Sequence, residues 1–379
     1  MKPVYEVAQV LEGNREQLVG ICANSWQLRT LHALRKCRTA SLGGHIDRCN
    51  NPSCHRLHLS YNSCRNRHCP KCQGHKKKEW IRAREEELLN VPYFHVVFTL
   101  PSALNRLCLY EPKLIYSLLF KISWQVVQGF ASNHKFMGAT PGMIAILHTW
   151  GQNLSLHPHL HCIVPGGGIA QSGKWKYAKN KGKYLFPVKA MSMVFRARFV
   201  ASLRKEFPPQ PTAFYENLFK HNWVVYCKRP FLGPAQVVEY LGRYTHKIAI
   251  SNHRIKSLDT NGVTFTVKDY RNGGRKRLLR LDDAEFIRRF TLHILPKGFI
   301  RIRHYGILSS TKKRELLPLL QQVLGRPVNH ERPPLKHRRC PYCQIGIMVT
   351  VAVFDSRGPP KAWSDKLKKY APGTTLQKA

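Results

Sequence analysis

Acidic residues are scarce in this chain. Its 379 residues include 21 Asp and Glu against 62 Lys and Arg, which gives a formal net charge of +41 and a pI of about 10.2. Such an excess of one sign opposes compaction unless a polyanion shares the surface. Nucleic acid is the favoured polyanion, because Lys and Arg release condensed counterions when they meet phosphates. The basic residues are spread along the whole chain, which predicts an extended binding surface rather than a basic arm.

Long apolar runs are also missing. No stretch approaches the roughly 20 apolar residues that a membrane span requires. The first 20 residues mix charged and apolar side chains and have no signal-type apolar core. A GxxxxGK(S/T) phosphate loop is absent as well. We therefore expect a soluble, cytoplasmic protein that works on nucleic acid, contacts no membrane and supplies no helicase of its own.

Cysteines are present and clustered. Of the twelve in the chain, five fall in the arrangement Cys49-x4-Cys54 and Cys64-x4-Cys69-x2-Cys72, with histidines among them. Two close pairs separated by a loop can offer zinc four ligands in tetrahedral directions, and this usage suits a reducing compartment. The simplest set is Cys49, Cys54, Cys69 and Cys72, although Cys64 can replace one of them. The sequence therefore predicts a structural Zn²⁺ site.

Basic residues surround the cysteine cluster. Arg65, Arg67 and Lys71 lie inside it, and a Lys-rich stretch follows it. A zinc module in such a setting is a candidate reader of DNA. We therefore expect these three side chains to contact DNA.

Composition divides the chain into three parts. Residues 1–90 combine helical patterns with the cysteine cluster, and residues 91–325 alternate strand and helix patterns. Residues 326–379 are basic, rich in Pro and Lys, and end in a polar segment typical of a disordered tail. They also carry Cys340-x2-Cys343, which is either half of a metal site completed elsewhere or a pair of ordinary cysteines.

The middle part predicts an α+β fold. Strand patterns at 93–100, 143–149 and 159–164 are joined mostly by hairpins, with helices inserted between some of them. This order favours an antiparallel sheet with flanking helices, preceded by a small zinc-binding domain that contains helices.

The segment from Leu156 to Pro165 contains a pair of histidines on a predicted strand. His159 and His161 are two apart, so they face the same side and can hold one divalent ion, while Leu160 faces a core. The alternative is a pair of packed or surface histidines. The sequence leaves the third ligand open among His157, His148 and Gln152.

A predicted helix over residues 234–247 carries a pair of tyrosines. Tyr240 and Tyr244 are four apart, so they lie on one face of the helix, one turn from each other. A tyrosine near a metal-polarised phosphate can attack it and become covalently attached. Arg243 and Lys247 can steady that phosphate. The alternative is that both tyrosines are core aromatics, because apolar residues lie close to the same face.

Three motifs occur together and in order. They are YNSCRNRHCPKC at 61–72, HPHLHC followed by PGGG at 157–168, and YLGRYTHKIAIS at 240–251. In this order the chain resembles the insertion sequence 91 family of rolling-circle transposases, in the paired-tyrosine branch of the HUH endonuclease superfamily. The resemblance extends from about residue 43 to 310. The Cys49–Cys54 spacing departs from the pattern expected of a regular zinc ribbon, in which two residues rather than four separate the paired cysteines.

The resemblance implies a fold and a chemistry. It implies an HUH-type antiparallel sheet that carries His159 and His161 as ligands of Mg²⁺ or Mn²⁺, with Tyr240 and Tyr244 as nucleophiles. The implied reaction nicks single-stranded DNA at element ends through a 5′-phosphotyrosine and rejoins it to target DNA, with host helicase or replication proteins as partners. The alternatives are a replication initiator or relaxase with the same chemistry, and a zinc-ribbon DNA-binding protein without catalysis.

Overall fold

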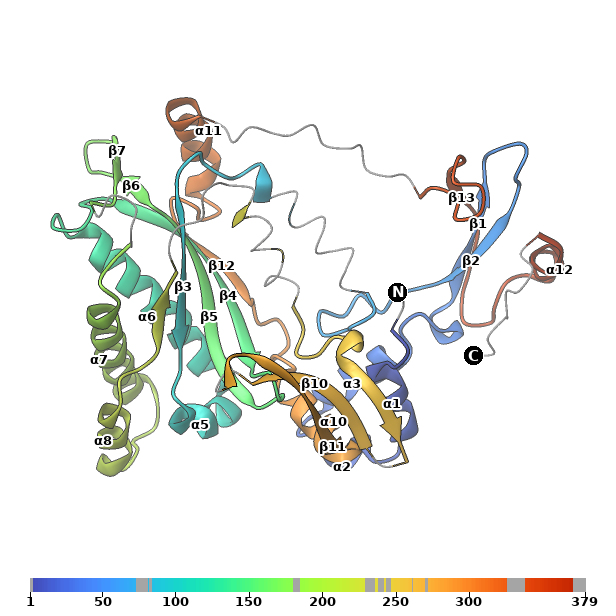
Figure 1. Cartoon of the computed structure of the whole chain (residues 1–379), viewed down its shortest axis with the longest axis horizontal. Coiled ribbons are helices and arrows are strands. Elements are labelled where there is room, and N and C mark those ends of the chain that lie inside the picture. Colours follow the sequence, from blue (N-terminus) through green and yellow to red (C-terminus); the bar gives the residue numbers. More distant parts are fainter. Residues whose placement is uncertain are drawn as a thin grey trace.

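The computed structural model describes residues 3–72, 81, 84–179, 185–228, 236–237, 242, 247–260, 262–269, 272–325 and 338–370. Within them the chain forms three sheets, all with antiparallel pairing, and helices that flank them (Figure 1). The predicted α+β class, with an antiparallel sheet preceded by a small cysteine-rich domain with helices, is confirmed. No helix in the described part of the chain is long and apolar enough to cross a bilayer.

The largest sheet has seven strands, in the order β7-β6-β4-β5-β3-β8 with β12 paired to β4. Its two long central strands form a hairpin whose residues alternate between the two faces. The strands are β3 (Tyr93–Thr99), β4 (Thr140–Trp150), β5 (Leu156–Pro165), β6 (Gly167–Ile169), β7 (Trp175–Tyr177), β8 (Val225–Cys227) and β12 (Ile302–Gly306).

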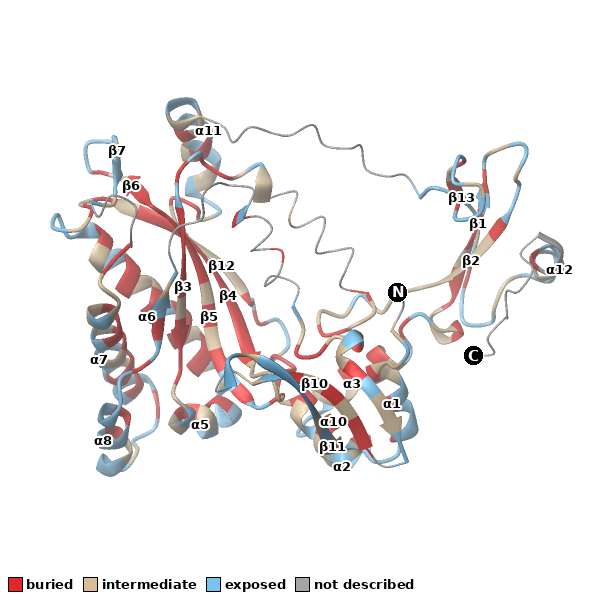
Figure 2. Cartoon of the chain, in the orientation of Figure 1, coloured by how far each residue is buried: buried red, intermediate tan, exposed pale blue. Residues whose placement is uncertain are grey.

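One face of this sheet is buried under helices. Leu160 and Cys162 of β5 and Leu147 of β4 point into a core that the helices close, and the Phe98 and Phe195 rings meet there with their centroids 5.0 Å apart. Figure 2 shows the central strands β3, β4 and β5 as largely buried. The longest of these helices begins at Pro112, and proline suits the first turn of a helix. The helices are α5 (Asn105–Tyr110), α6 (Pro112–Ser132), α7 (Val188–Glu206) and α8 (Thr212–Lys220), with the short η2 (Ser102–Leu104) before them.

The opposite face carries a second apolar cluster and the histidines. Ile144 and Ile146 of β4 and Ile163 of β5 pack there with Val237 and with α11 (Lys312–Leu324). By strand alternation, His148, His159 and His161 lie on this same face, beyond the end of the isoleucine cluster. One side of the sheet thus supplies the main core, and the other combines a smaller core with polar side chains.

The N-terminal helices pack against a second, three-stranded sheet. Leu31, Phe265 and Phe286 are fully buried in their shared core. The helices are α1 (Val7–Gly13), α2 (Leu18–Ile21) and α3 (Ser25–Arg35), and the other elements are η3 (Asn252–Arg254), β9 (Ile255–Asp259), β10 (Gly262–Asp269), β11 (Arg275–Asp282) and α10 (Asp283–Thr291).

The third sheet unites the two ends of the chain. Its order is β13-β1-β2, so the N-terminal strand β1 (Gly44–Cys49) lies between β2 (Leu57–Tyr61) and the C-terminal β13 (Met348–Phe354). The short η1 (Ala40–Leu42) precedes this sheet, and α12 (Lys361–Tyr370) follows it, at the right of Figure 1. Residues 371–379, where the sequence predicts a disordered tail, lie outside the described residues.

Candidate functional site

Three histidines converge on the open part of the central sheet. His148 on β4 is the antiparallel partner of His159 on β5, and His161 follows two residues later on the same face. Each offers a ring nitrogen, and the three atoms lie within 4.8 Å of one another. The ring centroid of His161 lies 4.6 Å from that of His148 and 4.9 Å from that of His159. This spacing allows all three imidazoles to bind one ion.

The structure distinguishes between the candidate third ligands. His148 is buried within the cluster, and the Trp150 ring stacks on it at 4.6 Å with an interplanar angle of 19°. His157 is exposed and is not part of the cluster, and Gln152 lies in the loop between β4 and β5, where its carbonyl accepts from Arg254. The cross-strand register therefore favours His148.

Neighbouring groups orient two of the rings. His159 Nδ1 donates to the His157 carbonyl oxygen at 2.7 Å, which puts the proton on Nδ1 and the remaining lone pair on Nε2. His161 Nδ1 lies 2.9 Å from Nε2 of His95, a buried residue of β3 on the same face. Metal-binding histidines are commonly fixed in this way by a partner on the other ring nitrogen. No local pattern in the sequence marks His95 as part of this site, since it lies 66 positions from His161.

Burial keeps these histidines neutral. It lowers the pKa of His159 to about 4, with the Lys247 charge acting in the same direction and the His157 carbonyl opposing it. The pKa of His161 is lowered strongly, again chiefly by burial and then by His148, and that of His95 falls to about 3. Neutral imidazole is the form that binds metal. His159 and His161 are therefore in the metal-binding form at neutral pH.

The tyrosine segment falls largely outside the described residues. Tyr240, Tyr244 and Arg243 are among those not described. The nearby Gln236, Val237 and Gly242 are described and helical. Val237 is fully buried in the isoleucine cluster on the histidine face of the sheet.

Lys247 is the first described residue after the tyrosine segment. The positive charge of Lys247 contributes to lowering the pKa of His159 and of His161. The Lys247 carbonyl accepts a hydrogen bond from Arg301 at 3.3 Å. Lys247, one of the predicted phosphate-binding residues, therefore lies in electrostatic range of the histidine cluster.

The cysteines form two groups, which corrects the predicted ligand set. Cys64, Cys69 and Cys72 meet Cys37, whereas Cys49 and Cys54 belong to the second group. Cys37 follows α3, so the helix carries it to the loop that holds the other three. The expected combination of Cys49, Cys54, Cys69 and Cys72 around one ion does not form, because β1 and β2 hold the first pair in the other sheet.

The second group also involves the C-terminal pair. Cys340 and Cys343 lie with Cys49 and Cys54, and their four sulfurs are within 4.8 Å of one another. The Cys340-x2-Cys343 motif is therefore half of a four-cysteine cluster whose other half is about 290 residues away in the sequence. Sequence spacing alone could not identify this pairing.

Two of the three basic residues predicted to contact DNA have partners inside the protein. Arg67 donates to the carbonyl oxygens of Pro296 and Phe299, and Lys71 forms a 2.6 Å ion pair with Glu6. Arg65 is exposed. Arg67 and Lys71 thus connect the Cys37 cluster to neighbouring parts of the chain.

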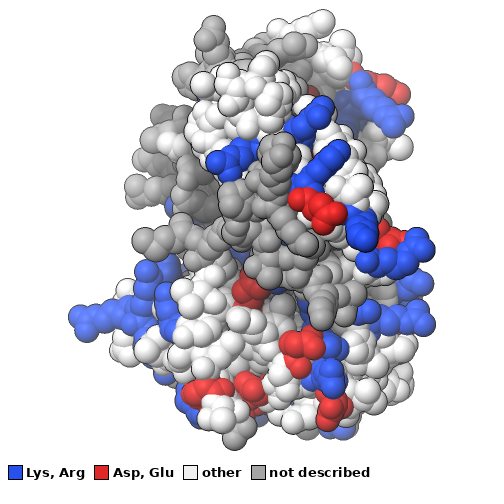
Figure 3. All heavy atoms as spheres, turned by 90° about the vertical axis from the view of Figure 1, so that its right-hand side faces the viewer, with Lys and Arg blue, Asp and Glu red and all other residues white. Residues whose placement is uncertain are grey.

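Basic side chains are spread over the face of the molecule that Figure 3 shows. Acidic ones are fewer there, and several lie directly beside a Lys or Arg. This distribution agrees with a charge excess that runs along the whole sequence. It suits an extended phosphate-binding surface.

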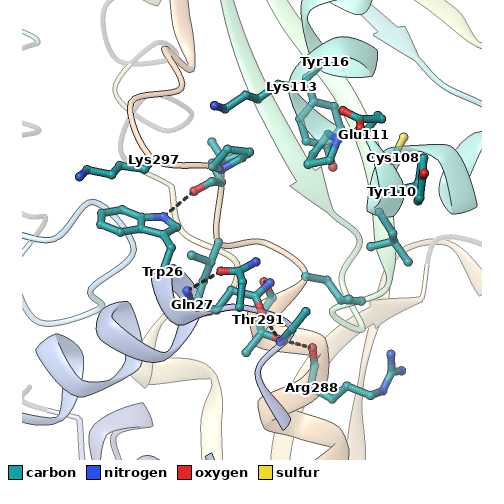
Figure 4. A pocket seen from close by; sticks show the side chains of 18 of the residues that line it. Trp26, Gln27, Cys108, Tyr110, Glu111, Lys113, Tyr116, Arg288, Thr291 and Lys297 are labelled. Carbon is teal, nitrogen blue, oxygen red and sulfur yellow. Dashed lines mark hydrogen bonds between the residues drawn. The ribbon is translucent and has the colours of Figure 1, made fainter. Parts of the chain in front are cut away.

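A pocket of about 580 Å³ lies between the N-terminal helices and the segment that follows α10 (Figure 4). Trp26 closes one side, where its Nε1 donates to the Leu295 carbonyl at 3.0 Å. Tyr116, Lys113 and Lys297 also line it. None of the clustered histidines does, so this pocket is separate from the candidate metal centre.

Comparison with known proteins matches two separate parts of the chain. Residues 142–315 match a family model described as putative transposase, and residues 11–100 match one described as transposase zinc-binding domain. The chain is 40% identical over 369 residues to the putative transposase y4qJ of Sinorhizobium fredii, covering 89% of this chain and 92% of that protein. It is 28% identical over 351 residues to the transposase for insertion sequence element IS801 of Pseudomonas savastanoi pv. phaseolicola, covering 86% and 84%. No solved structure matches.

Fold, cysteine clusters and these similarities together define an enzyme that acts on DNA and has a domain with structural zinc. The chain belongs to the insertion sequence 91 family of transposases. The family that the three sequence motifs indicated is thereby confirmed.

Proposed function

We propose that this transposase nicks and rejoins single-stranded DNA at the ends of its element by metal-dependent HUH chemistry, as in rolling-circle transposition. The convergence of His148, His159 and His161 carries the proposal, because a transposase needs a means to activate a phosphodiester. The three residues come from two paired strands of the central sheet, so their positions depend on rigid elements rather than on loops.

Three imidazoles can bind one divalent ion, and we propose Mg²⁺ or Mn²⁺ on the resemblance to HUH enzymes. Three neutral imidazoles fill only part of a coordination sphere and leave positions for water and for a phosphate oxygen. When bound, such an ion polarises the scissile phosphate and stabilises charge in the transition state. His95 and the His157 carbonyl keep two of the rings in the required tautomer and orientation.

Tyr240 and Tyr244 are the proposed nucleophiles. In the first step a tyrosine oxygen bonds to phosphorus, the bond from phosphorus to the 3′ oxygen breaks, and the released strand takes up a proton as a 3′-hydroxyl. The 5′ phosphate stays bound to the tyrosine as a phosphodiester, so the free energy needed to rejoin the DNA is conserved in this bond. Attack by another 3′-hydroxyl then reverses the chemistry and joins the DNA to a new strand.

Two observations on described residues support this assignment. Val237, three positions before Tyr240, packs on the sheet face that carries the histidines. Lys247, three positions after Tyr244, affects the pKa of His159 and His161 through its charge. The described residues on both sides of the tyrosine pair therefore lie near the sheet face that carries the histidines. Strand separation is left to host helicase or replication proteins, as the sequence has no phosphate loop for ATP hydrolysis.

Cleavage of labelled single-stranded oligonucleotides from the element ends, with Mg²⁺ or Mn²⁺, tests the proposal. We expect a covalent protein–DNA adduct that disappears in the Tyr240→Phe, Tyr244→Phe double variant. Tyr226→Phe is the matched control, since Tyr226 is an exposed residue of β8, and it should form the adduct normally. Unchanged adduct formation in the double variant would show that the nucleophile lies elsewhere. Absence of any adduct from the native protein would favour a DNA-binding role without catalysis.

A further inference from the structure

We propose that Cys49, Cys54, Cys340 and Cys343 bind a second structural zinc ion, which makes the C-terminal segment an integral part of the zinc-binding module. The match to the zinc-binding domain covers residues 11–100, so two of the four proposed ligands lie far beyond it. The site is also distinct from the group formed by Cys37, Cys64, Cys69 and Cys72. The chain would thus hold two structural zinc ions.

The distances between sulfurs fit tetrahedral zinc. A Zn–S bond of about 2.3 Å in a regular tetrahedron places neighbouring sulfurs about 3.8 Å apart. Cys49 Sγ lies 3.7 Å from Cys343 Sγ, and Cys54 Sγ lies 3.8 Å from Cys340 Sγ. These separations far exceed the roughly 2.05 Å of a disulfide bond. All four sulfurs therefore occupy positions that one ion can bridge.

Backbone groups surround the sulfurs as they do around thiolate ligands. The Asn51 N–H donates to Cys49 Sγ at 3.4 Å, and the Gly346 N–H donates to Cys343 Sγ at 3.3 Å. Such hydrogen bonds stabilise negative charge on sulfur. Gly346 also approaches the site so closely that a Cβ there would lie 2.3 Å from Cys49 Sγ. The turn after Cys343 thus requires a residue without a side chain.

The two halves of the site are joined by more than cysteines. Strand β1 pairs with β13 along its whole length, from Gly44 opposite Phe354 to Cys49 opposite Met348. Asp47, fully buried on β1, accepts from Arg338 and from Thr350, each at 2.7 Å. The cysteines therefore sit at the end of a hydrogen-bonded sheet that both ends of the chain build.

The apolar core of this sheet is small. Its buried apolar cluster consists of Ile46, Leu57, Phe354 and Leu367, with Met348 beside the cysteines. Modules with so little buried apolar surface usually depend on a metal or on disulfides. Zinc binding to a site that forms only on folding contributes its binding free energy to folding. The second ion is thus expected to supply much of the stability of this sheet.

Zinc content measured on full-length protein tests the proposal. The background is His159→Ala, His161→Ala, so that the histidine cluster contributes no metal and the result is independent of the proposed catalysis. This protein should contain two zinc ions per chain, and addition of Cys340→Ser and Cys343→Ser should leave one. Cys22→Ser with Cys227→Ser, two half-buried cysteines outside both clusters, is the matched control and should keep two. One ion in the background protein, or equal content with and without the C-terminal cysteines, overturns the proposal.

A variant that retains both metal ions distinguishes a change of ligand from misfolding of the protein. In cobalt-substituted protein, Cys343→His should keep two ions and shift part of the visible absorption to higher energy, because nitrogen replaces one sulfur ligand. An unchanged spectrum overturns the assignment of Cys343 as a ligand. In the variant with Cys340→Ser and Cys343→Ser, backbone amide hydrogen exchange should accelerate in residues 44–61, which are distant in sequence from the substitutions. Exchange in residues 112–132 should not change. Unchanged exchange in residues 44–61 refutes the structural role of the ion.

Discussion

Replacement of His95 by Phe isolates the role of the residue that supports His161. His95 is buried on β3, and burial lowers its pKa to about 3, so at neutral pH it is uncharged. Its Nε2 can therefore accept a hydrogen bond from the Nδ1–H of His161, 2.9 Å away. The two rings are also stacked, with centroids 5.1 Å apart and an interplanar angle of 20°. Phe preserves a ring in this position but removes the hydrogen bond. The variant therefore tests orientation and basicity of the ligand rather than packing.

The expected magnitude follows from the position of His95 behind a ligand. Loss of such a partner typically costs 10–100-fold in metal affinity or activity. This range corresponds to about 1.4–2.7 kcal/mol. Because His95 makes no direct contact with the ion in the proposed arrangement, the loss should appear mainly as weaker metal binding. Cleavage at saturating Mn²⁺ should recover most of the native rate.

Titration of Mn²⁺ against single-strand cleavage, together with direct binding by calorimetry, provides the assay. His95→Gln, which retains a polar group at the same place, should recover part of the lost affinity. His157→Ala is the matched control: this histidine is exposed, and the cluster uses only its carbonyl, so its metal affinity should remain native. A native Mn²⁺ dissociation constant in His95→Phe would refute the reasoning.

Three further predictions concern the metal site, the core and the attachment of the zinc module. His148→Ala removes the proposed third ligand and should lower Mn²⁺-dependent cleavage by more than the roughly 100-fold limit for supporting residues, whereas cleavage at the native rate would return His157 and Gln152 to consideration. Phe195→Ala empties a fully buried position between α7 and the sheet and should lower the free energy of unfolding in urea by about 3–5 kcal/mol; a loss below 1 kcal/mol would mean that the core is not packed as described. Arg67→Ala removes the hydrogen bonds to Pro296 and Phe299 and should destabilise the protein by about 2 kcal/mol in the same assay, while weaker DNA binding at unchanged stability would indicate that Arg67 contacts DNA instead.

Local patterns in the sequence were sufficient for the strands that carry the site. The predicted strands at 143–149 and 159–164 lie within β4 (Thr140–Trp150) and β5 (Leu156–Pro165). Alternation of residues along β5 correctly assigned Leu160 to the core and the flanking histidines to the other face. Such patterns are readable because side-chain direction in a strand depends only on position along the same strand. The family motifs are likewise contiguous, so they could be recognised without a structure.

Partners that lie far apart in the sequence required the tertiary structure. The register between β4 and β5 places His148 opposite His159, and the pairing of β3 with β5 brings His95 to His161. A shift of register by one residue would turn these side chains to the opposite face, so no single strand contains the information.

The cysteine clusters are the clearest case in which residues far apart in the sequence meet only in the tertiary structure. Their number and spacing by themselves predicted a zinc-binding domain, because close pairs of thiols are a local feature of the sequence. The tertiary structure determines which thiols cluster together. The end of α3 places Cys37 in one cluster, and the pairing of β1 with β13 places Cys340 and Cys343 in the other. The four ligands of one ion must be close in space but not in sequence. The spacing within one cysteine pair therefore does not show which distant pair completes its site.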